Sequence, residues 1–322
     1  MKTKILALFL LVSTIIHSQE IPKDNDVFII DYDSFSNINS LHDLAKKAKS
    51  TTNDQKEQLN ILLHWTYNNI TGDSERFFYG GELQNIEKTV KSGKGLCEDY
   101  TLIFNQYCKL LDIKSIRVDG YIKPINFKEN DKLERPNHTW NAVFIGQNWL
   151  LCDLFWSTTS LNFSNTFTNK INPKYFLSEG EIFIETHLPC DPIFQLLNNP
   201  IKLEAFTNLV EGYNKGFRKD ETIEYKTEIN KLLLLDKNEL LLKIARNTFS
   251  YNKNNPNSLI EELFNYGVDI LNNKSSTIKQ LNKAKSYFKE AKSLIPLSNK
   301  EDVKQLDFQC TEGIKIIDKR LI

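Results

Sequence analysis

A helical pattern followed directly by three strand-like stretches constrains the fold of this 322-residue chain more than any other part of its sequence. Residues 97–111 repeat apolar side chains every three or four positions, as one face of a helix does. The stretches 116–123, 139–145 and 149–155 are typical of strands, and the glycine-bearing segment 145–149 is typical of a hairpin turn. Helices followed by neighbouring antiparallel strands predict an α+β fold.

Helical periodicity continues on both sides of this unit. Helices are predicted at residues 41–48 and 54–69, and the region from residue 222 to the end is rich in Leu, Lys and Asn at helical spacing. Residues 281–296 resemble the second helix of a tetratricopeptide repeat, but a single copy favours a helical bundle over a repeat array. The predicted division of the chain is a signal peptide at 1–19, an α+β domain at 20–206 and a helical domain at 207–322.

The N-terminal residues have the pattern of a signal peptide. Lys2 and Lys4 precede an uncharged, mostly apolar run at residues 5–16, and Ser18 offers a small residue for cleavage. The run is shorter than the ~20 residues that a membrane-spanning helix requires. We therefore expect export to a periplasmic or extracellular location, which permits disulfides without requiring them.

The charge balance excludes some classes of partner. With 41 Lys and Arg against 41 Asp and Glu, the chain lacks the basic excess of a protein that binds nucleic acid nonspecifically. Apart from the N-terminal run, apolar stretches are cut short by charged residues, so an integral membrane protein is not expected. No CxxC or HExxH pattern occurs, and neither a metal nor a cofactor is expected.

Cys97 lies where a glycine-bearing loop meets the predicted helix start. Unpaired N–H groups at a helix N-terminus stabilise an anion and so favour a thiolate. The neighbouring Glu98 and Asp99 oppose a further negative charge, so a cationic partner is needed. His138, at the start of a predicted strand, is the candidate.

The hairpin supplies an acid for this histidine. If the turn spans residues 145–148, Phe144 pairs with Trp149, and continuing that register pairs His138 with Phe155. Asp153 is then a diagonal neighbour of His138 on the same face, because side chains alternate along a strand. An acid in that position orients the imidazole and stabilises the imidazolium.

Three motifs in this order resemble the signatures of transglutaminase-like proteins. They are Gly95-Leu96-Cys97-Glu98-Asp99-Tyr100, then His138-Thr139-Trp140-Asn141, then Cys152-Asp153-Leu154-Phe155-Trp156. Three further stretches are similar to the kyphoscoliosis-peptidase branch of that superfamily, at residues 64–70, 120–123 and 175–197. The likeness covers residues 28–206, and it departs from the family pattern at Phe155, where Thr is usual.

The resemblance implies a papain-like, transglutaminase-like core, with helices packed on an antiparallel sheet. The helical periodicity beyond this core predicts an α-helical C-terminal domain. The resemblance assigns Cys97 as nucleophile, His138 as general base and acid, and Asp153 as the orienting residue. Trp140 and Trp156 are expected to line the cleft. His187, in the downstream stretch, is interpreted as structural.

The leading hypothesis is an exported thiol peptidase or a transglutaminase-type acyl transferase. Its substrate is an amide in a protein, a peptide or a cell-wall crosslink, and the sequence leaves hydrolysis and transamidation open. The alternative is a non-catalytic binding or scaffold module whose C-terminal helices dock a protein partner. A filled triad favours the enzyme.

The other cysteines have less specific roles. Cys97 and Cys108 lie too far apart along one helix for a disulfide, at ~1.5 Å of rise per residue. Cys108 is expected in the core and Cys152 on the sheet face opposite Asp153. Cys190 and Cys310 either pair or stay free.

Overall fold

The computed structural model describes residues 30–123, 127, 133, 135–208 and 224–322. Residues 32–322 form one compact unit. The predicted signal peptide lies outside the described residues. The predicted junction at residues 206–207 borders the undescribed stretch 209–223, so the division into two domains stays a prediction.

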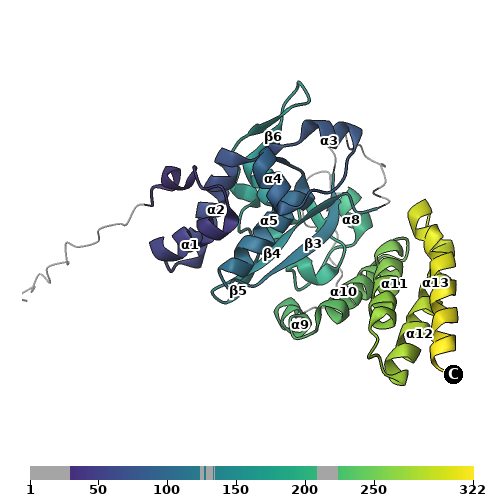
Figure 1. Cartoon of the computed structure of the whole chain (residues 1–322). Helices are drawn as coiled ribbons and strands as arrows, with labels where there is room; N and C mark the ends of the chain where they lie inside the picture. Colours follow the sequence, from purple (N-terminus) through teal and green to yellow (C-terminus); the bar gives the residue numbers. More distant parts are fainter. Residues whose placement is uncertain (1–29, 124–126, 128–132, 134, 209–223) are drawn as a thin grey trace, which may run out of the picture. The chain divides into compact units, whose positions relative to one another are not determined.

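The described chain is α+β, with a helical C-terminal region, as predicted (Figure 1). The N-terminal helices are α1 (Leu41–Thr51), α2 (Gln55–Asn69), α3 (Ser74–Tyr79), α4 (Ile86–Ser92) and α5 (Cys97–Leu110). The central sheet contains β3 (Ser115–Ile122), β4 (His138–Ile145), β5 (Asn148–Cys152) and β8 (His187–Pro189). The short strands are β1 (Thr71–Gly72), β2 (Lys94–Gly95), β6 (Thr159–Leu161) and β7 (Phe167–Asn169).

Short helices connect the sheet to the C-terminal region. They are α6 (Leu154–Thr158), α7 (Gly180–Phe183), α8 (Leu203–Asn208) and the 3-10 turns Tyr32–Phe35, Pro173–Tyr175, Pro192–Gln195 and Ile295–Leu297. The C-terminal helices are α9 (Tyr225–Leu232), α10 (Lys237–Tyr251), α11 (Asn257–Asn272), α12 (Ile278–Leu294) and α13 (Glu301–Arg320). None of the described helices is long and apolar enough to cross a membrane.

Local capping explains where the first helices begin. Ser40 accepts a hydrogen bond from Asp43 N–H at the start of α1, and Asp54 accepts one from Lys56 N–H at the start of α2. Each satisfies one of the N–H groups that a helix start leaves unpaired. At the start of α5 the cap comes from within the helix, because the Asp99 carboxylate accepts from Leu96 N–H at 2.7 Å.

The sheet has the order β5-β4-β3-β8 with antiparallel neighbours. Seven of the eight residues of β4 are buried, so this strand is covered on both faces. On one face Val118, Trp140 and Leu151 pack with Phe183 and other apolar side chains from outside the sheet. On the other face Asn141 donates to the α5 backbone.

The hairpin between β4 and β5 has the predicted register, since Phe144 pairs with Trp149. Gly146 in the turn has a φ of +61°, a conformation that glycine adopts without strain. The further prediction that His138 pairs with Phe155 in the same register is wrong. The strand ends at Cys152 because Asp153 caps helix α6, and Phe155 lies within that helix.

The C-terminal helices bury an apolar core of their own, in which α11 packs against α12 and α12 against α13. Phe288 of α12 is fully buried, close to Gly267 of α11 and Gly313 of α13. Ala284 and Ala291 are buried on the same face of α12. Small residues opposite an aromatic ring let these three helices approach closely.

Candidate active site

A cleft of about 720 Å³ has both Cys97 and His138 among its lining residues. This volume falls within the range of ligand pockets, roughly 300–1,000 Å³. One wall comes from the start of α5 and the adjoining ends of β3 and β4, and the opposite wall from α10 and α11. The charged residues that line it are Glu98, Arg117, Asp119, Arg135, Asp191, Glu261, Glu262 and Lys300.

Cys97 is the first residue of α5 and is partly exposed to this cleft. The preceding strand β2 pairs with β1, and Gly93 before it has a φ of +64°, in the left-handed region that favours glycine. Gly93 thus ends α4, and β2 leads from it to the start of α5, where the first-turn N–H groups have no partner within the helix.

The other four cysteines, Cys108, Cys152, Cys190 and Cys310, are buried and their thiols are free. Cys190 and Cys310 therefore do not form the disulfide that the sequence left open, and Cys108 is in the core as predicted. Burial raises the pKa of Cys108 to about 12 and that of Cys310 to about 11. Cys97 is thus the only one of the five cysteines that is not buried.

The two acids beside Cys97 are both paired. Glu98 accepts from Arg117 at 2.8 Å, and the buried Asp99 accepts from Arg76 at 2.6 Å. From the sequence these carboxylates are expected to oppose a thiolate, and no local pattern there indicates the two arginines. Their positive charges offset the negative charge next to the thiol.

His138 and Asp153 are in contact, although the strand pairing from which this contact was predicted ends at Cys152. The distance between His138 Nε2 and Asp153 Oδ2 is 2.6 Å, and both side chains are almost completely buried. The second oxygen, Asp153 Oδ1, accepts from Trp156 N–H at 2.9 Å, which fixes the carboxylate plane. Because Nε2 is occupied by Asp153, Nδ1 is the imidazole nitrogen left for Cys97.

The electrostatics of this pair favour charge separation. Burial alone would lower the pKa of His138, but the charge of Asp153, its hydrogen bond and a hydrogen-bonding contact with Cys97 raise it to about 10. Burial alone would raise the pKa of Asp153, but His138 and then His187 hold it well below its usual value. An imidazolium next to a carboxylate is therefore the stable state at neutral pH.

His187 of β8 also contacts this carboxylate, although the sequence analysis assigned it a structural role. Its Nε2 lies 3.1 Å from Asp153 Oδ2, and its Nδ1 lies 2.8 Å from Thr186 Oγ1. Burial lowers the pKa of His187 to about 4, so its ring is neutral. The only sequence signal for this residue was its place in the downstream stretch, far from the other site residues along the chain.

The rings of Trp140 and Trp156 both contact the two histidine rings. Trp140 is fully buried in the core, with its ring 6.0 Å from that of His138. This position differs from the expected place on the cleft wall, because Gly120 leaves space for its indole in the core beneath the sheet. Trp156 is partly buried, and its ring lies 5.8 Å from that of His138.

His138, Asp153 and His187 place three potential metal-binding atoms within 4.8 Å of one another. Both Nε2 atoms are hydrogen-bonded to the same carboxylate oxygen, and the remaining ring and carboxylate atoms have partners among Thr186, Trp156 and Cys97. These hydrogen bonds account for the cluster without a further ligand. The expectation of a metal-free site stays a prediction.

Polar contacts hold α10 and α11 against the sheet side of the cleft. Asn247 donates to the buried Asp191 at 2.9 Å, and Asn252 and Asn255 both donate to Tyr121 Oη. Amide donors on α10 and in the loop between α10 and α11 thus meet acceptors that follow β8 and lie on β3. The second wall of the cleft is a packed part of the same compact unit.

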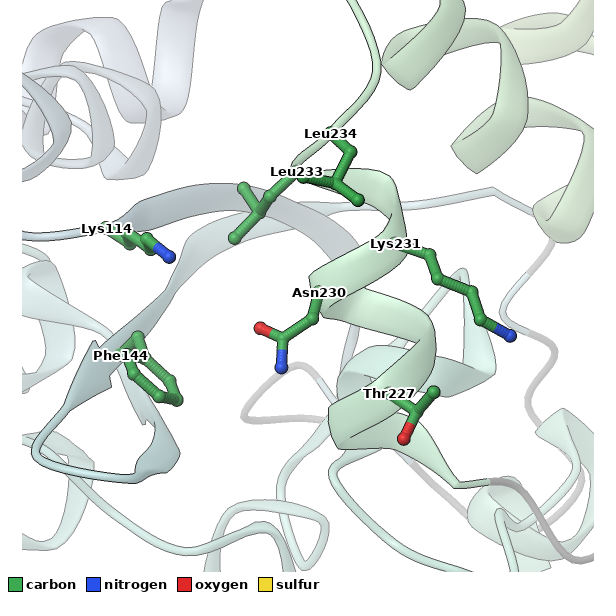
Figure 2. A pocket seen from close by; sticks show the side chains of 7 residues that line it. All are labelled: Lys114, Phe144, Thr227, Asn230, Lys231, Leu233 and Leu234. Atoms are coloured by element: carbon green, nitrogen blue, oxygen red, sulfur yellow. The ribbon is translucent and has the colours of Figure 1, made fainter.

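A second hollow, about 620 Å³, lies between α9 and the β3–β4 region (Figure 2). It is lined by Lys114, Phe144, Thr227, Asn230, Lys231, Leu233 and Leu234. None of the predicted site residues lines it, and it contains no thiol, imidazole or carboxylate. Of these two hollows, only the cleft that holds Cys97 has a thiol and an imidazole among its lining residues.

Comparisons with known proteins agree with this geometry. The family model of the transglutaminase-like superfamily matches residues 42–154, a stretch that includes Cys97, His138 and Asp153. The chain therefore carries a transglutaminase-like domain.

Curated relatives that are similar to this domain include two kyphoscoliosis peptidases. The chain is 27% identical to kyphoscoliosis peptidase of Mus musculus, in an alignment that covers 55% of this chain and 28% of the relative. It is 32% identical to kyphoscoliosis peptidase of Homo sapiens, in an alignment that covers 39% of this chain and 20% of the relative. Hillarin of Drosophila melanogaster is 25% identical over 35% of this chain and 15% of the relative. The chain thus matches less than a third of the length of each of these relatives.

A solved structure titled "Crystal structure of a TGase" aligns with 40% of this chain and 34% of its own, at 12% identity and a TM-score of 0.28. That score is too low for conclusions about detail.

Asp191 generates a prediction about pH. Burial raises its pKa to about 7, although hydrogen bonds from Asn247 and Ile193 N–H lower it. Between the usual value near 3.8 and about 7, the folded state binds more protons than the unfolded chain, so the free energy of unfolding falls as pH rises through this window. We expect Asp191→Asn to remove that decline, a change of a few kcal/mol at ~1.4 kcal/mol per pKa unit.

Urea unfolding at pH 5, 6, 7 and 8 measures this effect. The exposed Asp112, changed to Asn, is the matched control and should keep the wild-type slope. A wild-type slope in Asp191→Asn would contradict the assignment.

Proposed function

We propose that the protein is a cysteine-dependent enzyme that acts on amide bonds, with Cys97, His138 and Asp153 as a catalytic triad. The observation that carries the proposal is the buried hydrogen bond between His138 Nε2 and Asp153 Oδ2. It leaves the second ring nitrogen of His138, Nδ1, for the hydrogen-bonding contact with the partly exposed Cys97. A thiol, an imidazole and a carboxylate in this order are the arrangement that activates a thiolate nucleophile.

The steps follow from these positions. The Cys97 thiolate attacks the carbonyl carbon of an amide, and the charge that develops on the carbonyl oxygen lies near the unpaired Cys97 N–H at the start of α5. The His138 imidazolium donates its Nδ1 proton to the departing amine, leaving a thioester on Cys97. The neutral imidazole then takes a proton from the incoming nucleophile, and attack on the thioester releases the acid or a new amide. Asp153 stays ionised throughout.

Peptidase-like hydrolysis is the proposed outcome, with transamidation as the variant in which an amine replaces water. The two mammalian relatives named as peptidases support the first. The domain class supports protein or peptide substrates. A cell-wall crosslink contains the same kind of amide bond, and the cleft is lined by residues of two helices as well as of the sheet.

The first test is the loss of the nucleophile. We expect Cys97→Ala to abolish labelling by an iodoacetamide probe and to reduce cleavage of a quenched fluorescent peptide library to background, because no other thiol is exposed. Cys310→Ala, in the C-terminal helices, is the matched control and should retain both signals.

The outcome also separates the two classes of function. Turnover that persists in Cys97→Ala would rule out this mechanism. A wild-type protein that neither reacts with the probe nor cleaves any library member would favour the non-catalytic scaffold, in which the C-terminal helices dock a protein partner.

We also propose that the chain is exported, on the basis of the signal-peptide pattern at residues 1–19. Expressed in a bacterial host with a secretion pathway, the protein should be recovered from the periplasm or medium with a new N-terminus near Gln19 or Glu20. Mass spectrometry of the intact chain checks this. A cytoplasmic product that begins at Met1 would contradict it.

A further inference from the structure

His187 is a fully buried histidine that the proposed mechanism does not use. It is 0% exposed, and the rings of Phe183, Trp156 and Trp140 lie 4.4, 4.8 and 5.1 Å from its own. An aromatic enclosure of this kind would suit any apolar ring equally well. A polar imidazole in such a place therefore requires hydrogen bonds that justify its burial.

Strand pairing explains how His187 reaches the carboxylate. On β3, Gly120 pairs with His138 of β4 and with Pro189 of β8, and Ile122 pairs with His187. Side chains of His138 and His187 therefore project from the same face, on either side of Gly120. A Cβ at Gly120 would lie 2.3 Å from the Trp140 ring, so glycine at this position lets the indole pack against the strand beside the two histidines.

The hydrogen bonds fix the proton positions. An ionised Asp153 can only accept, so His187 Nε2 carries the proton and donates it to Oδ2 at 3.1 Å. Because the ring is neutral, Nδ1 keeps a lone pair, which accepts from Thr186 Oγ1 at 2.8 Å. Thr186 thus selects the tautomer of His187 that can serve Asp153.

We propose that His187 is a positioning residue that holds the Asp153 carboxylate with Oδ2 directed at His138, so that the triad becomes a chain of four side chains. This inference rests on the proposed function. Trp156 N–H holds Oδ1 and His187 holds Oδ2 from a second direction, so the carboxylate cannot rotate away from His138. Partners that orient the ligands of metal sites contribute about 10–100-fold, and we expect an orienting effect of similar size here.

Two substitutions of opposite character test it. His187→Phe fills the aromatic enclosure but removes the donor, whereas His187→Gln packs less well but keeps an N–H near the position of Nε2. We expect the rate at which iodoacetamide alkylates Cys97 at pH 6.5 to fall about tenfold in His187→Phe and to stay within about twofold of wild type in His187→Gln. The signal of Cys97→Ser is subtracted as the background.

A role in packing alone predicts the reverse order. If His187→Phe reacts as fast as His187→Gln, or faster, the positioning role is overturned. A stoichiometric metal ion in the purified protein that is lost in His187→Gln would overturn it as well, in favour of a ligand role.

Thr186 provides a second pair of variants with less risk to folding, because this residue is only partly buried. Thr186→Val removes the hydroxyl that selects the tautomer and should slow alkylation, whereas Thr186→Ser keeps the hydroxyl and should not. Equal rates in the two variants would contradict the proposed hydrogen-bond chain.

The same assay separates this inference from the proposed function. Asp153→Asn should slow alkylation at least as much as His187→Phe. If Asp153→Asn slows it and His187→Phe does not, His187 has no positioning role and the triad stands. If neither slows it, Asp153 is not coupled to Cys97, and the proposed function fails together with the inference.

Discussion

The structure around the cleft depends on one buried carboxylate, that of Asp153. Its side chain is 1% exposed, and a carboxylate taken out of water is costly unless donors replace the lost hydration. Three groups do so here, the imidazoles of His138 and His187 on Oδ2 and the Trp156 N–H on Oδ1. The charge in turn stabilises the imidazolium of His138.

This requirement links three strands and a helix. Asp153 leaves β5 to cap α6, His138 begins β4 and His187 begins β8, so the three side chains meet only if the strands pair in one register. A shift by one residue would move each side chain to the opposite face. The hydrogen bonds of the site and the packing of the sheet therefore support the same arrangement.

Much of this arrangement could be predicted from local sequence signals. The helix start at Cys97 follows from a glycine-bearing loop before an apolar period, and the pairing of Phe144 with Trp149 follows from a tight turn. The end of β5 could not be predicted, since it depends on Asp153 acting as a helix cap. His187 lies far from the other site residues in sequence, and only the completed sheet brings it to Asp153.

The central claim is that Asp153 keeps His138 charged, whereas burial keeps the neighbouring His187 neutral. Nitrogen-15 NMR of the imidazole rings at pH 7 tests it most directly, with His138→Gln and His187→Gln used to assign the signals. The account predicts that both nitrogens of His138 are protonated and that His187 carries one proton, on Nε2. A neutral His138 at pH 7, or a His187 protonated on Nδ1 alone, would contradict it.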